Sequence, residues 1–186
     1  ERGYIKSTTF MVNRVTKDQE PQLARLKKLT KENKISVGLH VEFNLENPLN
    51  SQVEEQFRKF KKILEFYPSH IDYHKYGGNL SCVNAVNKFG EKKNLPVRHM
   101  EITPKTKHTT YSVIVTKPFG IKNIHKFLDK MKDDESCEVY CHPGEYDPDC
   151  KSSLNEARKE DYLAVIELHK YLSKHRGIKN ISYNEL

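Results

Sequence analysis

Apolar, β-prone segments alternate with helical segments along almost the whole chain, and this alternation is the feature that most restricts the fold. The order read from the sequence is β-α-β-α-β-α-β, then an ambiguous stretch over 101–119, then α-β-α-β. Such an alternation favours a parallel sheet whose strands are joined by helical crossovers. The β-prone segments are residues 4–12, 35–43, 70–74, 97–98, 109–116, 137–141 and 178–183.

The length of 186 residues suits one domain, so we expect a single domain over residues 1–186. Six or seven strands favour a TIM-like β/α barrel, with an open doubly wound sheet as the alternative. The chain does not open on methionine, and Glu1-Arg2-Gly3 resembles the last turn of a helix with its terminal glycine. We therefore expect the barrel to lack its first strand–helix unit.

Two capping-box patterns predict where helices begin. Each pairs a serine with a glutamate three residues later: Ser51 with Glu54, and Ser153 with Glu156. We expect a helix to open at each pattern, because apolar residues with helical spacing follow both. A third helix is expected over residues 80–93, after a glycine-rich turn.

Three histidines stand at the ends of three predicted strands: His40, His74 and His142. The carboxyl ends of parallel strands meet at one edge, which is where α/β folds place their chemistry. Neutral imidazole binds divalent metals, and a nearby carboxylate completes the shell or orients the ring. Asp72 and His70 share a strand face with His74, since alternate residues point the same way. We predict His40 and His74 as metal ligands, while any one of these histidines taken alone is more often structural.

Two further residues are candidates for catalysis. His142 precedes Pro143-Gly144, so a turn there presents its imidazole at the strand end, where it can act as a general acid or base. The alternative is a plain turn with an incidental histidine. Arg98 can hold a carboxylate or stabilise a developing oxyanion, and a surface salt bridge is an equally good interpretation.

The chain carries a net charge of +7, with paired lysines such as Lys27-Lys28 and Lys61-Lys62 on predicted helices. Dispersed charges of this kind favour solvated helix faces, so we expect no nucleic acid as a partner. No segment has the length and apolarity of a membrane span and no signal peptide is visible, so we expect no membrane contact and a cytoplasmic location. No P-loop, GxGxxG, GxSxG or HExxH motif occurs, which argues against nucleotide-binding, serine-hydrolase and zincin classes.

Several motifs in this order resemble those of the YdjC-like carbohydrate deacetylases. The most specific are a Gly-Leu-His strand ending at His40, a His-x-Asp-x-His element over 70–74, and a His-Pro-Gly element over 142–144. Leu95-Pro96-Val97-Arg98 also fits. The chain departs from the family pattern at Tyr73 and Tyr76, where serine and histidine are usual.

The resemblance implies a TIM-like barrel that removes acetyl groups from N-acetylated sugars such as chito-oligosaccharides. It implies a divalent metal, Mg²⁺ or Zn²⁺, held by an aspartate together with His40 and His74. His142 is then the acid–base candidate and Arg98 a second catalytic candidate. The family's metal aspartate belongs to a strand upstream of Glu1, so we expect weak metal binding and little hydrolysis by these 186 residues.

Three alternatives stay open at this point. One is a non-catalytic, carbohydrate-binding relative that has lost the aspartates. Another is a metal hydrolase acting on a different bond, because a set of histidines does not fix the bond that is cleaved. The third is a nucleic-acid binder driven by the positive charge. We expect an N-acetylated oligosaccharide as the molecular partner and a homodimer as the candidate assembly.

Overall fold

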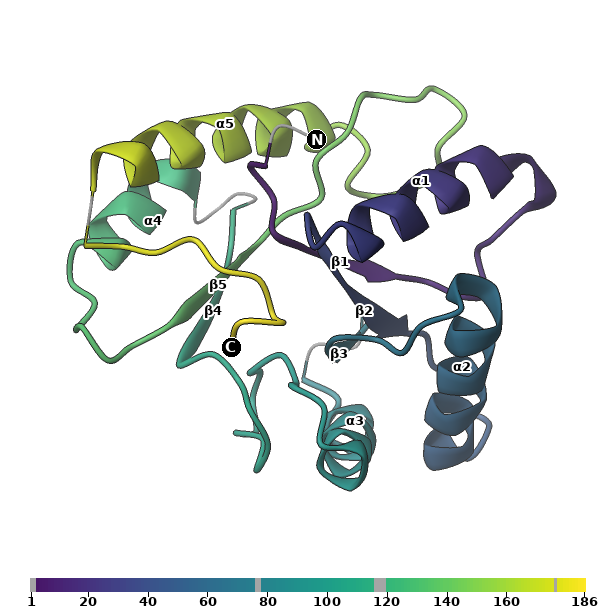
Figure 1. Ribbon diagram of the computed structural model, residues 1–186. Helices are drawn as coiled ribbons and strands as arrows, with labels where there is room; N and C mark the ends of the chain where they lie inside the picture. The colour runs from purple at the N-terminus through teal and green to yellow at the C-terminus, as the bar shows by residue number, and fades with distance from the viewer. Residues whose placement is uncertain (1–2, 76–77, 116–119, 176) are drawn as a thin grey trace. The chain divides into compact units, whose positions relative to one another are not determined.

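The computed structural model describes residues 3–75, 78–115, 120–175 and 177–186. Helices and parallel strands alternate along it, so the predicted α/β class is confirmed (Figure 1). The described residues fall into two compact units, one of residues 3–108 and 181–186 and the other of residues 109–180. The helix end predicted at Glu1-Arg2 and the departure at Tyr76 lie outside the described residues.

The first unit contains a parallel sheet in the order β1-β2-β3. A further segment joins it beyond β3, where Val97 forms a parallel bridge with Ile71. The predicted strand at 97–98 is therefore present only as this bridge. The strands are β1 (Ser7–Phe10), β2 (Ser36–Val41) and β3 (Ile71–Tyr73).

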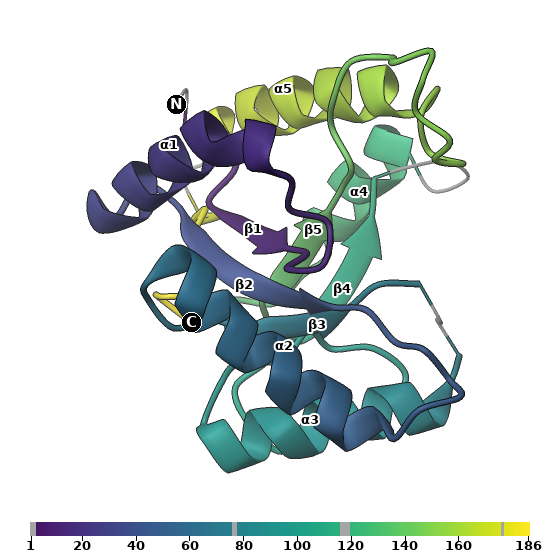
Figure 2. The ribbon, with the colours of Figure 1, turned by 90° about the vertical axis from the view of Figure 1, so that its right-hand side faces the viewer.

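Helices connect the strands of this unit, as the crossover pattern predicts. α2 packs against β2, α3 packs against β3, and the two helices lie side by side (Figure 2). α3 has the predicted bounds because the side chain of Asn79 accepts hydrogen bonds from the first-turn backbone. The helices are α1 (Glu20–Lys31, after a 3₁₀ turn at Lys17–Gln19), α2 (Leu49–Leu64) and α3 (Leu80–Lys93).

The capping box predicted at Ser51 is wrong. α2 begins at Leu49, so the capping residue is Pro48, three residues before Ser51, and the Ser51 hydroxyl donates to the Pro48 carbonyl at 2.8 Å. Pro48 has no polar side-chain atom, so α2 begins without a side-chain cap.

The core of the first unit lies between the sheet and its helices. Leu39, Val41 and Ile71 are fully buried in the strands, and Phe60 and Val53 are fully buried on α2. Apolar residues alternate with polar ones or glycine along β2 (Ser36–Val41), so one face of the strand packs into this core and the other carries His40. This packing holds the carboxyl ends of β2 and β3 in register.

A close packing of His70 stabilises the sheet just below those strand ends. A Cβ added at Gly38 would lie 2.6 Å from two atoms of the His70 ring. The same ring stacks on Tyr183, with ring centroids 3.8 Å apart. The strand predicted at 178–183 is wrong, because the described residues there form no ladder, and Tyr183 is fixed instead by its ring and by a bond from its N–H to Ser7 Oγ.

Gly38→Ala should therefore lower the free energy of unfolding by about 1–3 kcal/mol, the usual cost of overpacking. The His70 ring has little room to shift, since it is buried and stacked on Tyr183. Urea denaturation measures the effect. Gly177→Ala is the matched control, because an added Cβ there meets nothing within 4 Å. Equal stability of the two variants would contradict this packing.

The second unit has its own sheet and core. β4 (Tyr111–Ile114) pairs in parallel with β5 (Cys137–Tyr140), and α4 (Gly120–Leu128) packs against α5 (Arg158–Lys174). The capping box predicted at Ser153 is wrong, since α5 begins at Arg158 after Ala157. The segment before α5 forms turns instead. The Asn155 side chain accepts a hydrogen bond from the Asp147 N–H and donates one to the Asp147 carbonyl.

A closed barrel is not seen among the described residues. Closure requires an unbroken ring of paired strands, and the ladders here join β1, β2 and β3 in one sheet and β4 and β5 in another. The TIM-like barrel and the single domain over 1–186 therefore stay predictions. None of the helices in the described ranges combines the length and apolarity that crossing a bilayer requires.

Candidate functional site

Polar side chains form two rows across the sheet where β2 and β3 end. In the first row the parallel register places His40 opposite Asp72. Arg98 comes next in this row, because the backbone N–H of Arg98 donates to the Ile71 carbonyl at 3.2 Å. In the second row the His74 N–H donates to the Val41 carbonyl at 2.7 Å, which continues the register to Glu42 and His74. Because alternate residues of a strand share a face, both rows lie on the same face of the sheet.

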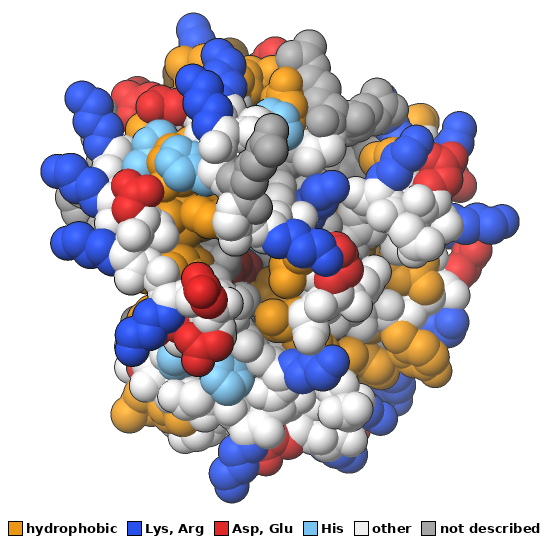
Figure 3. Space-filling model, turned by 60° about the vertical axis from the view of Figure 1, so that its left-hand side comes forward, with side chains coloured by type: hydrophobic (Ala, Val, Ile, Leu, Met, Phe, Trp, Pro, Cys, Tyr) orange, Lys and Arg blue, Asp and Glu red, His pale blue; other side chains and the backbone are white. Residues whose placement is uncertain are grey.

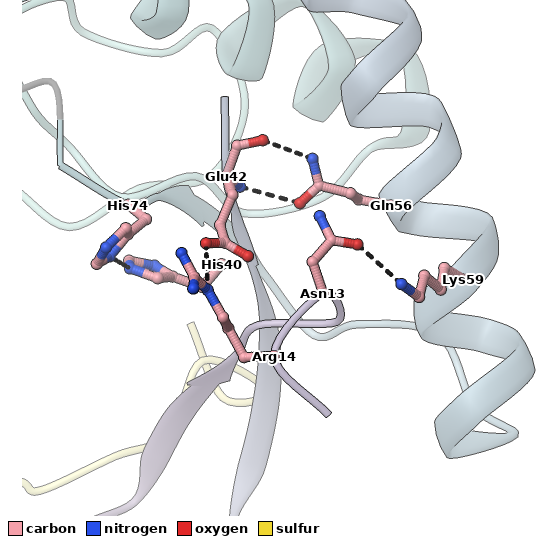
Figure 4. Close-up of polar contacts among 7 residues, drawn as sticks. All are labelled: Asn13, Arg14, His40, Glu42, Gln56, Lys59 and His74. Carbon is pink, nitrogen blue, oxygen red and sulfur yellow. Dashed lines mark hydrogen bonds and ion pairs between the residues drawn. The ribbon is translucent and has the colours of Figure 1, made fainter. Parts of the chain in front are cut away.

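His40 and His74 meet across these rows. His40 Nε2 is 3.2 Å from His74 Nδ1, and the rings are nearly perpendicular (Figure 4). Two nitrogens bound about 2.1 Å from one ion would lie about 3.0 Å apart at a right angle and about 3.4 Å apart at the tetrahedral angle. The two rings are hydrogen-bonded to each other at this separation, which also lies within the range for two ligands of one ion.

Asp72 fixes the orientation of His40. Its buried carboxylate lies with Oδ1 2.6 Å from His40 Nδ1 and Oδ2 2.5 Å from Arg98 Nη1. Burial alone would raise the pKa of Asp72, but the charges of Arg98 and His40 and the bond to His40 lower it below its usual range. An ionised Asp72 accepts the Nδ1 proton of His40, which leaves the Nε2 lone pair directed at His74.

Arg98 is brought into the site through Asp72. The side chain of Arg98 is 13% exposed and that of Asp72 is 1% exposed, so the alternative of a surface salt bridge is wrong. Of its two predicted roles, contact with a carboxylate is the one observed. A direct catalytic role for Arg98 stays a prediction.

Glu42 is a member of the site that the sequence reasoning missed. It follows β2 directly, and its side-chain Oε1 accepts a bond from Arg14 Nε at 2.8 Å. Gln56 of α2 holds its backbone, accepting from the N–H at 2.9 Å and donating to the carbonyl at 2.7 Å (Figure 4). The spacing of two residues from His40 was the available signal, since it places Glu42 on the face that carries His40.

His142 belongs to the second unit and follows β5. Its backbone N–H donates to Oδ2 of the buried Asp161 on α5, at 2.7 Å. The next turn is also tied to that helix, because the Gly144 N–H donates to the Arg158 carbonyl at 3.2 Å. The His-Pro-Gly turn is thus fixed at two points on α5, and the acid–base role of His142 stays a prediction.

Lowering the pH should destabilise the metal-free protein through His74. Burial, followed by the nearby His40, lowers the pKa of His74 from its ordinary value of 6.5. The folded chain thus binds this proton less readily than the unfolded chain, so stability is lost as the pH falls below about 6.5. Urea unfolding at several pH values should show a smaller loss in His74→Gln than in the unaltered chain. Equal losses would contradict the prediction.

Two imidazoles alone make an incomplete metal shell. Among the residues that the structure describes, no three His, Cys, Asp or Glu side chains are already gathered as a ligand set. The residues present therefore fit a divalent metal as a two-histidine portion of its shell, with the orientation that Asp72 provides.

Two comparisons with known proteins agree with each other. The family described as YdjC-like protein matches residues 47–174, a range that contains His74, Arg98 and His142. A protein named carbohydrate deacetylase from Clostridium beijerinckii (strain ATCC 51743 / NCIMB 8052) is 26% identical over 214 residues. That similarity covers 94% of this chain and 82% of the relative.

Proposed function

Because the chain belongs to the YdjC-like protein family, we propose that it is a metal-dependent deacetylase of N-acetylated sugars, such as chito-oligosaccharides. The observation that carries the proposal is the separation of 3.2 Å between His40 Nε2 and His74 Nδ1 at the carboxyl ends of two parallel strands. The name of the similar clostridial protein supports the type of bond and substrate.

In this proposal each residue has a separate task. A divalent ion bound at the histidine pair would polarise the amide carbonyl and make a water more acidic. His40 and His74 would hold the ion through neutral imidazole nitrogens, and Asp72 would keep His40 in the tautomer that binding needs. His142 remains the candidate for the general acid that would protonate the leaving amine of the sugar.

Of the two metals expected from the sequence, the ligands favour Zn²⁺. Imidazole nitrogen suits zinc, whereas Mg²⁺ prefers an octahedral shell of oxygen atoms. A shell that already includes His40 and His74 is therefore better matched to zinc.

The positive side chains on the face drawn in Figure 3 are dispersed, as the sequence suggested. Figure 3 shows Lys and Arg side chains spread over the face drawn, interspersed with acidic and neutral ones. A sugar is a neutral partner, so binding it does not depend on a continuous positive surface. The absence of nucleic-acid and membrane partners, the cytoplasmic location and the homodimer stay predictions.

Acetate release from N,N′-diacetylchitobiose tests the proposal. We expect acetate release that stops when EDTA is added and returns with excess Zn²⁺. Sugar binding without any acetate release would favour the non-catalytic alternative. Metal-dependent hydrolysis of a phosphate ester, with the acetamide left intact, would favour a different bond.

A further inference from the structure

We propose that Tyr146 is a stacking platform for a second sugar ring of the substrate. This inference rests on the proposed function and adds to it a preference for oligosaccharides over single sugars. Tyr146 belongs to the second unit, in the loop between β5 and α5 that Figure 1 draws in green. Tyr146 is 58% exposed. One exposed ring is ordinary by itself, and three further features of this loop give the ring a role.

The first feature is a backbone that is fixed on both sides of Tyr146. Before it, the Gly144 N–H donates to the Arg158 carbonyl at 3.2 Å. After it, the Asp147 N–H donates to Asn155 Oδ1 at 3.1 Å, and Asn155 Nδ2 donates to the Asp147 carbonyl at 2.6 Å. Asn155 itself is buried. A tyrosine ring has few rotatable bonds, so on a fixed backbone it loses little conformational entropy when a ligand covers it.

The second feature is the short chain distance to the candidate acid. Tyr146 lies four residues after His142 in the same unit. Four residues span at most about 14 Å, and a short oligosaccharide can bridge such a distance. A sugar that reacts at His142 can therefore have a neighbouring sugar of the same chain at Tyr146.

The third feature is a local chemistry that suits a neutral sugar. One face of a pyranose ring carries mainly C–H bonds, so it can pack on the apolar face of an aromatic ring. Glu145 and Asp147 stand on either side of Tyr146, and both are exposed. Their negative charges repel phosphates and other anions, whereas their oxygens can accept hydrogen bonds from sugar hydroxyls. A neutral oligosaccharide is therefore the ligand class that fits.

NMR titration of the full 186-residue chain with tetra-N-acetylchitotetraose tests the inference. EDTA is present throughout, so that binding is measured without the proposed hydrolysis. Tyr146→Ala should raise the dissociation constant about three- to tenfold, the usual value of an aromatic contact. Tyr146→Phe keeps the ring and should stay within about twofold of the unaltered chain. The advantage of the tetrasaccharide over N-acetylglucosamine should shrink in Tyr146→Ala by the same factor as its affinity.

Tyr67→Ala is the matched control, because Tyr67 is 62% exposed. Its ring is already engaged, since it stacks on Phe57 with centroids 5.6 Å apart and Lys61 Nζ lies 4.7 Å from its centroid. Tyr67→Ala should change the dissociation constant by less than about twofold. Equal weakening by Tyr67→Ala and Tyr146→Ala would overturn the inference, because any exposed tyrosine would then contribute.

Asn155→Ala gives an independent sign. It should weaken binding of the tetrasaccharide although the Tyr146 ring is retained, because the loop is then released from α5 on one side of the ring. The same substitution in the Tyr146→Ala background should bring much less further loss. Equal losses in both backgrounds would contradict the platform. Thermal unfolding checks that each variant is folded, and Asn155→Asp, which removes only the Nδ2 donor, keeps the test if Asn155→Ala does not fold.

The inference and the proposed function fail in different ways. If the unaltered chain releases acetate with zinc, but Tyr146→Ala binds the tetrasaccharide as tightly as the unaltered chain, the proposed function stands and the role of Tyr146 is wrong. If Tyr146→Ala binds more weakly as expected, but the unaltered chain releases no acetate, the platform stands and deacetylation is wrong.

Discussion

Asp72→Ala should lower the free energy of unfolding by about 3–5 kcal/mol, the usual cost of removing one partner from a buried ion pair. The Asp72 carboxylate is 2.5 Å from Arg98 Nη1 and 2.6 Å from His40 Nδ1. Without it, the Arg98 guanidinium keeps its charge in a site where its side chain is only 13% exposed. The loss is therefore mainly the cost of an uncompensated charge.

Urea denaturation of a small set of variants separates this cause from others. The double variant Asp72→Ala/Arg98→Met should regain a large part of the lost stability, since both charges are then absent. Glu54→Ala is the matched control, because its ion pair with Lys92 joins side chains that are 48% and 62% exposed. It should cost about 0–1 kcal/mol. A double variant as unstable as Asp72→Ala alone would contradict the account.

Asp72→Asn should weaken divalent metal binding about 10- to 100-fold, the usual effect of losing a group that orients a metal ligand. The amide keeps the shape of the carboxylate but removes its charge, and it can present N–H groups to His40 Nδ1 and Arg98. Either change weakens the preference for the His40 tautomer whose Nε2 lone pair is free. The effect should therefore be larger on metal affinity than on sugar binding.

Zinc titration and sugar titration of the same samples measure these two effects. Glu101→Gln is a useful control, because Glu101 bonds Tyr73 and the Gly78 N–H rather than a histidine of the pair. Glu101→Gln should change the dissociation constant for zinc by no more than about twofold, far less than the loss of a carboxylate that orients a metal ligand. Zinc binding by Asp72→Asn at the unaltered affinity would show that Asp72 does not orient His40.

The sequence allowed the regular elements to be predicted where local signals and burial agree. α3 has its predicted bounds because the Asn79 cap and the apolar spacing favour the same helix. Both predicted capping boxes were wrong because the helices begin at other residues. α2 begins directly after Pro48, and α5 begins only after a turn that the Asn155 side chain stabilises. The segment 178–183 is β-prone, yet a ring contact and a side-chain bond fix Tyr183 rather than a strand ladder.

The site was predictable to the extent that strand alternation determines it. His40 and His74 each end an apolar strand, so their common edge followed from a parallel sheet. The role of Arg98 did not follow, because it depends on a register between Asp72 and a segment that is joined by a single bridge. The spacing of two residues places Glu42 on the face of His40, but its position opposite His74 depends on the continued register between the strands.

The central claim is that His40 and His74 hold one divalent metal ion together, and zinc titration into two double variants tests it most directly. His99 and His108 form a matched pair, with ring centroids 5.3 Å apart compared with 5.2 Å for His40 and His74, and similarly crossed rings. His40→Ala/His74→Ala should lose the zinc site, whereas His99→Ala/His108→Ala should keep one zinc per chain at unaltered affinity. Zinc binding that survives in the first variant and disappears in the second would contradict the account.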